Sequence, residues 1–204
     1  MKNNEVNRDR LSAYGEYFTP PEIVSEMLKM VETQLERIDS RFLEPACGTG
    51  NFLVPVLEKK LQLAYRQYRK IPFEYEQQAL LALGSIYGIE LQMDNVNVCR
   101  DRLFSIWERA YKKVCKQQCS EDTIKSARYI IDRNIVCGDA LTMKDDQDGP
   151  IVLSEWAFIM PRKLQRTDYL FASLSNADNA RSEDASVFLE KHVMDYRRIW
   201  ENVN

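Results

Sequence analysis

The sequence predicts an α/β fold in which helices cover both faces of a doubly wound parallel sheet. Three apolar runs of strand length alternate with amphipathic segments of helical period, and two glycines stand directly after the first run. Alternation of strand and helix along a chain is typical of parallel sheets that are covered on both faces. The 204 residues, of which 45% are hydrophobic and 29% charged, suit one globular domain.

The chain is expected to become ordered near residue 14 and to enter its first helix at Thr19. Residues 1–13 are polar and are interpreted as a flexible arm. Thr19 is the predicted N-cap, Pro20 the first helical residue, and Glu22 the partner that closes a capping box. Apolar residues then recur every fourth position and predict one face turned to a core; they are Ile23, Met27, Val31 and Leu35.

A strand, a glycine turn and a helix are expected next. "RFLEPACG" (41–48) is a short run that ends in small residues. The helix that follows has a bend expected at Pro55, and its inner face is formed by Phe52, Val56, Lys60 and Ala64. "SIYGIELQ" (85–92) is the second predicted strand, residues 93–117 the second amphipathic helix, and "YIIDRNIVCGDAL" (129–141) the third strand.

The last quarter of the chain has weaker patterns. "IVLSEWAFIM" (151–160) predicts a fourth strand, residues 161–180 a mixed loop, and residues 182–203 a terminal helix capped by Ser182. We therefore expect one domain over residues 14–160, followed by a loop and helix (161–204) that pack on the domain or on a partner. The sheet is expected to be truncated after its fourth strand.

Composition and charge exclude several classes of protein. No run approaches the roughly 20 apolar residues that a membrane span needs, and the N-terminus lacks an apolar signal core, so a cytoplasmic protein without membrane contact is expected. The five cysteines lack C-x-x-C spacing, and the single histidine, His192, is distant, so no zinc site is predicted. The net charge of −3 neither indicates nor excludes a nucleic-acid binder, and the favoured interpretation of three basic clusters, at 58–70, 108–116 and 161–166, is a solvated helix face or loop.

Acidic residues mark the ends of the predicted strands. Glu44 precedes the glycine turn, Glu90 ends the second strand and Asp139 ends the third. Because the carboxyl ends of parallel strands meet at one edge of a sheet, these carboxylates are expected to converge on one crevice with the turn. A carboxylate at such a strand end can accept hydrogen bonds from ribose hydroxyls or from the exocyclic amine of adenine. The pattern predicts a nucleoside-binding site.

Four segments, in this order, resemble the first signature segments of the adenine-N6 DNA methyltransferases of the gamma arrangement, including those of restriction-modification systems. They are "YGEYFTP" (14–20), "FLEPACGTGNFL" (42–53), "YGIEL" (87–91) and "NIVCGDAL" (134–141). The resemblance implies a Rossmann-like fold of the class I methyltransferase type, S-adenosylmethionine as cofactor and DNA as partner. It covers residues 14 to about 141.

The resemblance also assigns residues to the methionine part of the cofactor. Phe18 and Thr19 would border that part, with Thr19 near the methionine carboxylate. Glu44 would hold the methionine amine. The turn would let the backbone approach the cofactor closely through Ala46, Gly48 and Gly50.

The nucleoside part of the cofactor is assigned in the same way. Glu90 would accept the ribose hydroxyls and Asp139 the adenine amine, while the apolar walls would be Ile89, Leu91 and Leu141. For the apolar residues, a simple role in the core is an equally good interpretation.

The catalytic residues stay unassigned. In the resembled family an N/D-P-P-Y/F/W loop after the fourth strand accepts the amine hydrogens and stacks on a flipped base. Here the only Pro-Pro pair is Pro20-Pro21, and Ser154, Glu155 and Trp156 stand where the loop is expected. An ordinary strand with Trp156 in or beside the core is the favoured interpretation. The alternatives are an enzyme completed by a partner or second copy that also covers the sheet edge, and a non-catalytic cofactor-binding or assembly subunit.

Overall fold

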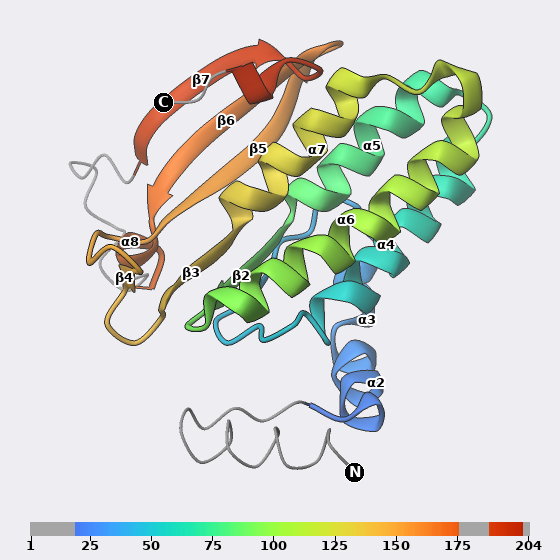
Figure 1. Cartoon of the computed structure of the whole chain (residues 1–204). Coiled ribbons are helices and arrows are strands. Elements are labelled where there is room, and N and C mark those ends of the chain that lie inside the picture. The colour runs from blue at the N-terminus through green and yellow to red at the C-terminus, as the bar shows by residue number, and fades with distance from the viewer. Residues whose placement is uncertain (1–18, 176–187, 202–204) are drawn as a thin grey trace.

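The first part of the chain forms a small sheet with three parallel strands, beside a group of helices (Figure 1). A computed structural model describes residues 19–175 and 188–201. The parallel strands are β1 (Phe42–Glu44), β2 (Ile86–Glu90) and β3 (Ile135–Asp139). They pair in the order β1-β2-β3, and the two-residue strand β4 (Lys144–Asp145) adds antiparallel to β3. The predicted parallel sheet is therefore confirmed.

A long helix follows each of β1 and β2, as the spacing of apolar residues in the segments after these strands predicts. The helices of this part are α2 (Pro21–Met30), α3 (Glu32–Leu35), α4 (Leu53–Tyr68), α5 (Pro72–Gly84), α6 (Met93–Cys115) and α7 (Glu121–Asn134), with a 3₁₀ turn at Lys116–Gln118. The predicted inner face of α4 is confirmed, because Phe52, Val56, Lys60 and Ala64 are all buried. On α6 the inward residues Val96, Cys99 and Leu103 are likewise buried.

The cap predicted for the first helix is wrong by one residue. The N-cap is Pro20 rather than Thr19, the first helical residue is Pro21, and no side chain caps the helix. Either proline of the pair suits the start of a helix, because proline has a fixed φ and no N–H to satisfy there. A Pro-Pro pair therefore leaves the starting residue ambiguous in the sequence.

The third predicted strand is too long, because its first half belongs to a helix. Residues 129–134 end α7, and β3 begins only at Ile135. Ile130 and Ile131 lie in the helix and are buried in the core. A short apolar run is compatible with a buried strand and with a buried helix, so its sequence does not distinguish them. Helices α5 and α7 are both absent from the sequence prediction.

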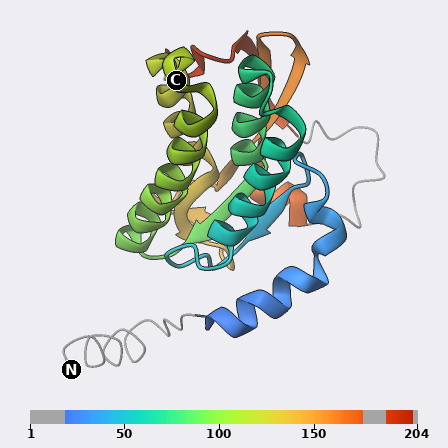
Figure 2. The ribbon, with the colours of Figure 1, turned by 90° about the vertical axis from the view of Figure 1, so that its right-hand side faces the viewer.

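The expectation of helices on both faces of the sheet is not met in residues 19–175 and 188–201. Helices α4, α5, α6 and α7 gather on one side of the sheet (Figure 2). They share a core with Ile86 and Ile135. The opposite face presents Tyr87 and Ile89, which pack against Ile151, Leu153 and Phe171 from the region after β4.

A second, antiparallel sheet follows, and it corrects the expectation for the last quarter of the chain. Its strands are β5 (Val152–Met160), β6 (Lys163–Leu170) and β7 (Phe188–Asp195), in that order, with the short helix α8 (Phe171–Ser175) after β6 and a 3₁₀ turn at Ile199–Glu201. The predicted strand at 151–160 is confirmed, although it does not join the parallel sheet. The loop over 161–180 and the terminal helix are wrong, since β6 and β7 occupy those positions; Ser182 lies outside the described residues.

The expected domain boundary at residue 160 falls within the β5–β6 hairpin. Eight residue pairs join the two strands from Val152↔Leu170 to Met160↔Lys163. The segment after 160 therefore continues the structure of the segment before it. In the described ranges β1 pairs with β2 alone, so its other edge has no strand partner there.

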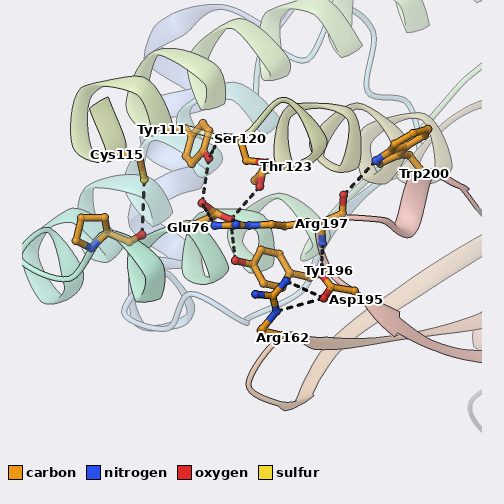
Figure 3. Close-up of polar contacts among 11 residues, drawn as sticks. Glu76, Tyr111, Cys115, Ser120, Thr123, Arg162, Asp195, Tyr196, Arg197 and Trp200 are labelled. Atoms are coloured by element: carbon orange, nitrogen blue, oxygen red, sulfur yellow. Dashed lines mark hydrogen bonds and ion pairs between the residues drawn. The ribbon is translucent and has the colours of Figure 1, made fainter. Parts of the chain in front are cut away.

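Buried polar groups attach the antiparallel sheet to the helices. Trp156 donates from its indole nitrogen to Asn134 Oδ1 at 3.1 Å, and Arg133 bonds the buried carboxylate of Asp168 at 2.8 Å. The Glu76 carboxylate on α5, 2% exposed, receives hydrogen bonds from α6, α7 and the chain after β7 (Figure 3). Its donors are Tyr111 (3.0 Å), Thr123 (2.9 Å), Tyr196 (2.7 Å) and Arg197 (2.7 and 3.2 Å). One buried carboxylate thus joins four segments.

A buried lysine on α4 fastens the entry to β1. The Lys60 ammonium is fully buried and donates to Ile38 O and Ser85 Oγ, each at 2.8 Å, and to Ser40 O. Burial lowers the pKa of Lys60 from its ordinary 10.5 to about 7, against an opposing effect of Asp39. The lysine predicted on the inner face therefore reaches polar backbone rather than solvent.

We expect the protein to become more stable as pH rises from about 6.5 to about 8.5. In this window the unfolded chain keeps the proton on Lys60 and the folded chain releases it, so the unfolded state binds more protons and the free energy of unfolding rises with pH, by about 2 kcal/mol. Denaturant unfolding at several pH values measures it. Lys60→Met should lack this part of the slope, and identical slopes in the two proteins would contradict the assignment.

No helix in the described ranges is long and apolar enough to cross a membrane.

Candidate functional site

The turn after β1 takes the sharp form that its glycines allow. It spans residues 45–52, between β1 and α4, and both Gly48 (φ 51°) and Gly50 (φ 83°) have a left-handed backbone. A Cβ at Gly50 would lie 2.7 Å from the Cys99 sulfur. The two glycines are needed here because other residues rarely adopt this backbone and because α6 lies directly against the turn.

Glu90 ties the turn to the end of β2. Its Oε2 accepts a hydrogen bond from Gly48 N–H at 2.8 Å, and its Oε1 accepts one from Gln92 N–H at 3.0 Å. The Cys47 N–H also donates to Ile89 O at 3.0 Å. A carboxylate oxygen has two lone pairs, so each oxygen of Glu90 keeps capacity for one more donor.

Glu44 lies beside Glu90 with one oxygen unsatisfied. Its Oε2 is buried and has no hydrogen-bond partner. Burial, with the neighbouring charge of Glu90 as the second cause, raises the pKa of Glu44 to about 7. A buried oxygen without a donor is costly, and a cationic N–H group would satisfy it. The structure therefore brings Glu44, Glu90 and the turn together and leaves one Glu44 oxygen without a donor.

Asp139 stands at the same edge of the sheet, one strand further on. Its Oδ1 accepts the Leu141 N–H at 2.8 Å, and this bond lowers the pKa of Asp139. A hollow of about 320 Å³ is lined by both Asp139 and Leu91, together with Cys137, Gly138 and Thr142. Leu91 is 59% and Leu141 92% exposed, so both side chains are accessible at this edge of the sheet.

The remaining predicted residues have different positions. Ile89 is fully buried in the core on the other face of the sheet, so its predicted role as a wall of the site is wrong. Ala46 is exposed in the turn. Thr19 is half-buried at the start of α2, and Phe18 lies outside the described residues. The proximity of these two to the turn stays a prediction.

Two residues of α6 that support the turn are absent from the sequence prediction of the site. Cys99 packs under Gly50, and Arg102 bonds Thr49 and Asn51. Their spacing of three places both on one helix face, and Cys99 was predicted to point inward. The only sequence signal for Arg102 was its position three residues after Cys99, on the same face of the helix.

Ser154, Glu155 and Trp156 do not reach this site. Trp156 is buried at the opposite end of the sheet, where a Cβ on Gly84 would meet it at 3.0 Å. Ser154 donates to Asp168 at 2.6 Å, and Glu155 pairs with Arg41, directly before β1, at 2.8 Å. The interpretation of this segment as an ordinary strand is confirmed.

Comparison with known families identifies the domain. The family model described as MmeI, DNA-methyltransferase domain, matches residues 21–160, well over half of the chain. The chain belongs to this family. The match to the MmeI methyltransferase domain runs from α2 to the end of β5 and includes Glu44, Glu90 and Asp139.

One curated relative is a protein of Methanocaldococcus jannaschii that is named as a type II restriction enzyme and methyltransferase. It is 25% identical over 146 residues, which are 69% of this chain and 12% of the relative. The chain thus spans about an eighth of that protein. No solved structure shows significant similarity to this MmeI-type domain.

A larger hollow of this MmeI-type domain lies elsewhere. It measures about 1030 Å³ and runs between α2 and α3 on one side and α4 and α6 on the other, with Leu28, Leu61 and Ile106 in its lining. None of the predicted site residues within 19–175 lines it. Within the described part of the chain, no group of three or more His, Cys, Asp or Glu side chains is placed to hold a metal ion.

Gly50→Ala is expected to destabilise the domain by about 1–3 kcal/mol, because alanine at φ 83° is strained and its Cβ would meet Cys99 at 2.7 Å. Denaturant unfolding measures the loss. Cys99→Ala makes room for the new Cβ, so Gly50→Ala should cost less in that background. Gly149→Ala, where the backbone is not left-handed, is the control and should lose less than Gly50→Ala. Equal losses would contradict the argument.

Proposed function

We propose that this chain is the S-adenosylmethionine-binding part of a DNA methyltransferase of the restriction-modification type, and that the methylated atom is N6 of adenine. The buried, unpartnered oxygen of Glu44 beside Glu90 and the glycine turn carries the proposal. Membership of the MmeI methyltransferase-domain family supports the reaction class.

The residues at the strand ends suit the parts of this cofactor. The Glu44 oxygen would accept from the methionine ammonium, and Glu90 would use its remaining lone pairs for the ribose hydroxyls. Asp139 would accept from the adenine amine, with Leu91 and Leu141 against the ring. Phe18 and Thr19 would complete the methionine side. When bound, S-adenosylmethionine supplies a methyl group on a sulfonium that a nucleophile can take.

The choice of adenine N6 rests on the order of the four signature segments. An exocyclic amine becomes nucleophilic when acceptors take its hydrogens and turn its lone pair toward the methyl group. No N/D-P-P-Y/F/W sequence occurs in the 204 residues, and the segment at 154–156 is committed to the core and to Arg41. We propose that these acceptors, and a cover for the open edge of β1, come from outside these residues, in a partner chain or a second copy.

A second candidate is a non-catalytic cofactor-binding or assembly subunit. The burial of Trp156 and the pairing of Glu155 with Arg41 favour it. Neither residue is then available to accept the hydrogens of the substrate adenine's N6 amine. This candidate predicts cofactor binding without turnover. Transfer of the methyl group therefore separates the two.

Calorimetric titration with S-adenosylmethionine tests the site, and transfer of a labelled methyl group tests the reaction. Glu90→Ala and Asp139→Ala should each weaken binding by at least about tenfold, while Glu121→Ala, an exposed acid on α7, should not. Label should enter adenine-containing duplex DNA and not a duplex of G and C alone, with candidate partners present. Unchanged affinity in both variants would remove the site, and binding without transfer would favour the second candidate.

A further inference from the structure

Arg102 lies about two and a half turns into α6, and its side chain reaches the glycine turn. Its Nη1 donates to Thr49 O at 2.6 Å and to Asn51 Oδ1 at 2.9 Å, with a longer contact to Thr49 Oγ1 at 3.2 Å. These bonds join residues about 50 positions apart in the chain. One side chain of the second helix therefore holds the turn that follows the first strand.

The guanidinium of Arg102 is directed to the turn rather than to an acid. It is half-buried, and no carboxylate in residues 19–175 or 188–201 forms an ion pair with it. Arg100, two residues earlier, bonds Ile135 O at 2.7 and 2.9 Å and Asp132 O at 3.1 Å instead. Arg100 therefore supports the start of β3, whereas Arg102 supports the turn.

The contacts of Arg102 complement those of Glu90. Glu90 and the Cys47–Ile89 bond hold the first half of the turn, before Thr49. Arg102 holds the second half, which includes the left-handed Gly50. Glycine has the largest conformational freedom of any residue, so a turn with two glycines keeps one shape only when its flanks are fixed.

We propose that Arg102 is a positioning residue that holds residues 49–51 in the shape that receives the cofactor. The inference rests on the proposed function, because it concerns the same site. A turn that is ordered before binding avoids the entropic cost of ordering on binding, and affinity rises accordingly. Arg102→Met removes all three contacts and keeps most of the side-chain volume.

Two measurements on the full chain test the proposal. Hydrogen–deuterium exchange of residues 46–52 without ligand reports on the order of the turn, and titration with S-adenosylmethionine reports on affinity. Arg102→Met should speed exchange in the turn and weaken binding by about tenfold or more. Arg100→Met is the matched control and should lower stability at β3 with little effect on either reading. Arg102→Lys, which keeps a donor for Thr49 O, should recover part of both losses.

The outcomes separate this inference from the proposed function. Unchanged exchange in Arg102→Met, or equal effects in Arg102→Met and Arg100→Met, would overturn the positioning role. A wild-type chain that binds no S-adenosylmethionine would overturn the proposed function, while the exchange measurement would still decide whether Arg102 orders the turn.

Discussion

Glu76→Ala is expected to destabilise the fold by about 3–5 kcal/mol, because it leaves the charge of Arg197 and several buried donors without their common acceptor. The carboxylate is 2% exposed and joins α5 to α6, α7 and the chain after β7 (Figure 3). Removing one partner of a buried pair costs far more than a surface ion pair contributes. Guanidinium unfolding of the full chain measures the change in the free energy of unfolding.

Controls separate the network from the effect of any substitution on α5. Glu74→Ala, an exposed acid two residues earlier, should stay within about 0.5 kcal/mol of wild type. Tyr196→Phe removes one donor to Glu76 and should cost about 1 kcal/mol, which keeps the test useful if Glu76→Ala does not fold. If Glu76→Ala and Glu74→Ala were equally stable, the hydrogen bonds of Glu76 would not hold the chain after β7 to the helices.

The affinity for S-adenosylmethionine is expected to rise about 20-fold between about pH 5.5 and pH 7.5. The pKa of Glu44 is raised to about 7 by burial and by Glu90, and a cationic amine binds the deprotonated carboxylate. Affinity therefore increases as Glu44 loses its proton. The upper limit of the window is set by the amine of the cofactor, because an α-amino group loses its own proton near pH 8. Calorimetric titration across the range measures the profile.

Two variants identify the group responsible for this pH dependence. Glu44→Gln should bind weakly with a flat profile, and Glu90→Gln should move the rise to lower pH because it removes a like charge from beside Glu44. Without cofactor, the Glu44 proton has the opposite effect: the stability of the fold falls as pH rises. The folded chain holds the Glu44 proton to higher pH than the unfolded chain, so the free protein loses stability from about pH 4.5 to 7. A profile in Glu44→Gln that matches wild type would exclude Glu44 as the source.

Sequence patterns predicted the helices and strands in which buried apolar residues recur at a regular spacing. Helix α4 and strand β2 have regular apolar residues, and both lie close to their predicted bounds. Strand β6 escaped prediction because its inner face carries Arg166 and Asp168, both buried, which read as loop residues in the sequence. Their charges are tolerated inside because Tyr129, Ser154 and Arg133 bond them from other elements.

The sequence by itself determined the glycine turn and the edge at which Glu44, Glu90 and Asp139 stand, because parallel strands end at one edge whatever surrounds them. Only the tertiary structure decided that one Glu44 oxygen is left without a donor, that Arg102 holds the turn and that Trp156 lies at the far end of the sheet. Each of these depends on contacts between residues far apart in the chain, such as the 53 positions between Thr49 and Arg102. No local pattern of residues encodes such a contact, because it forms only when the packed elements bring the two segments together.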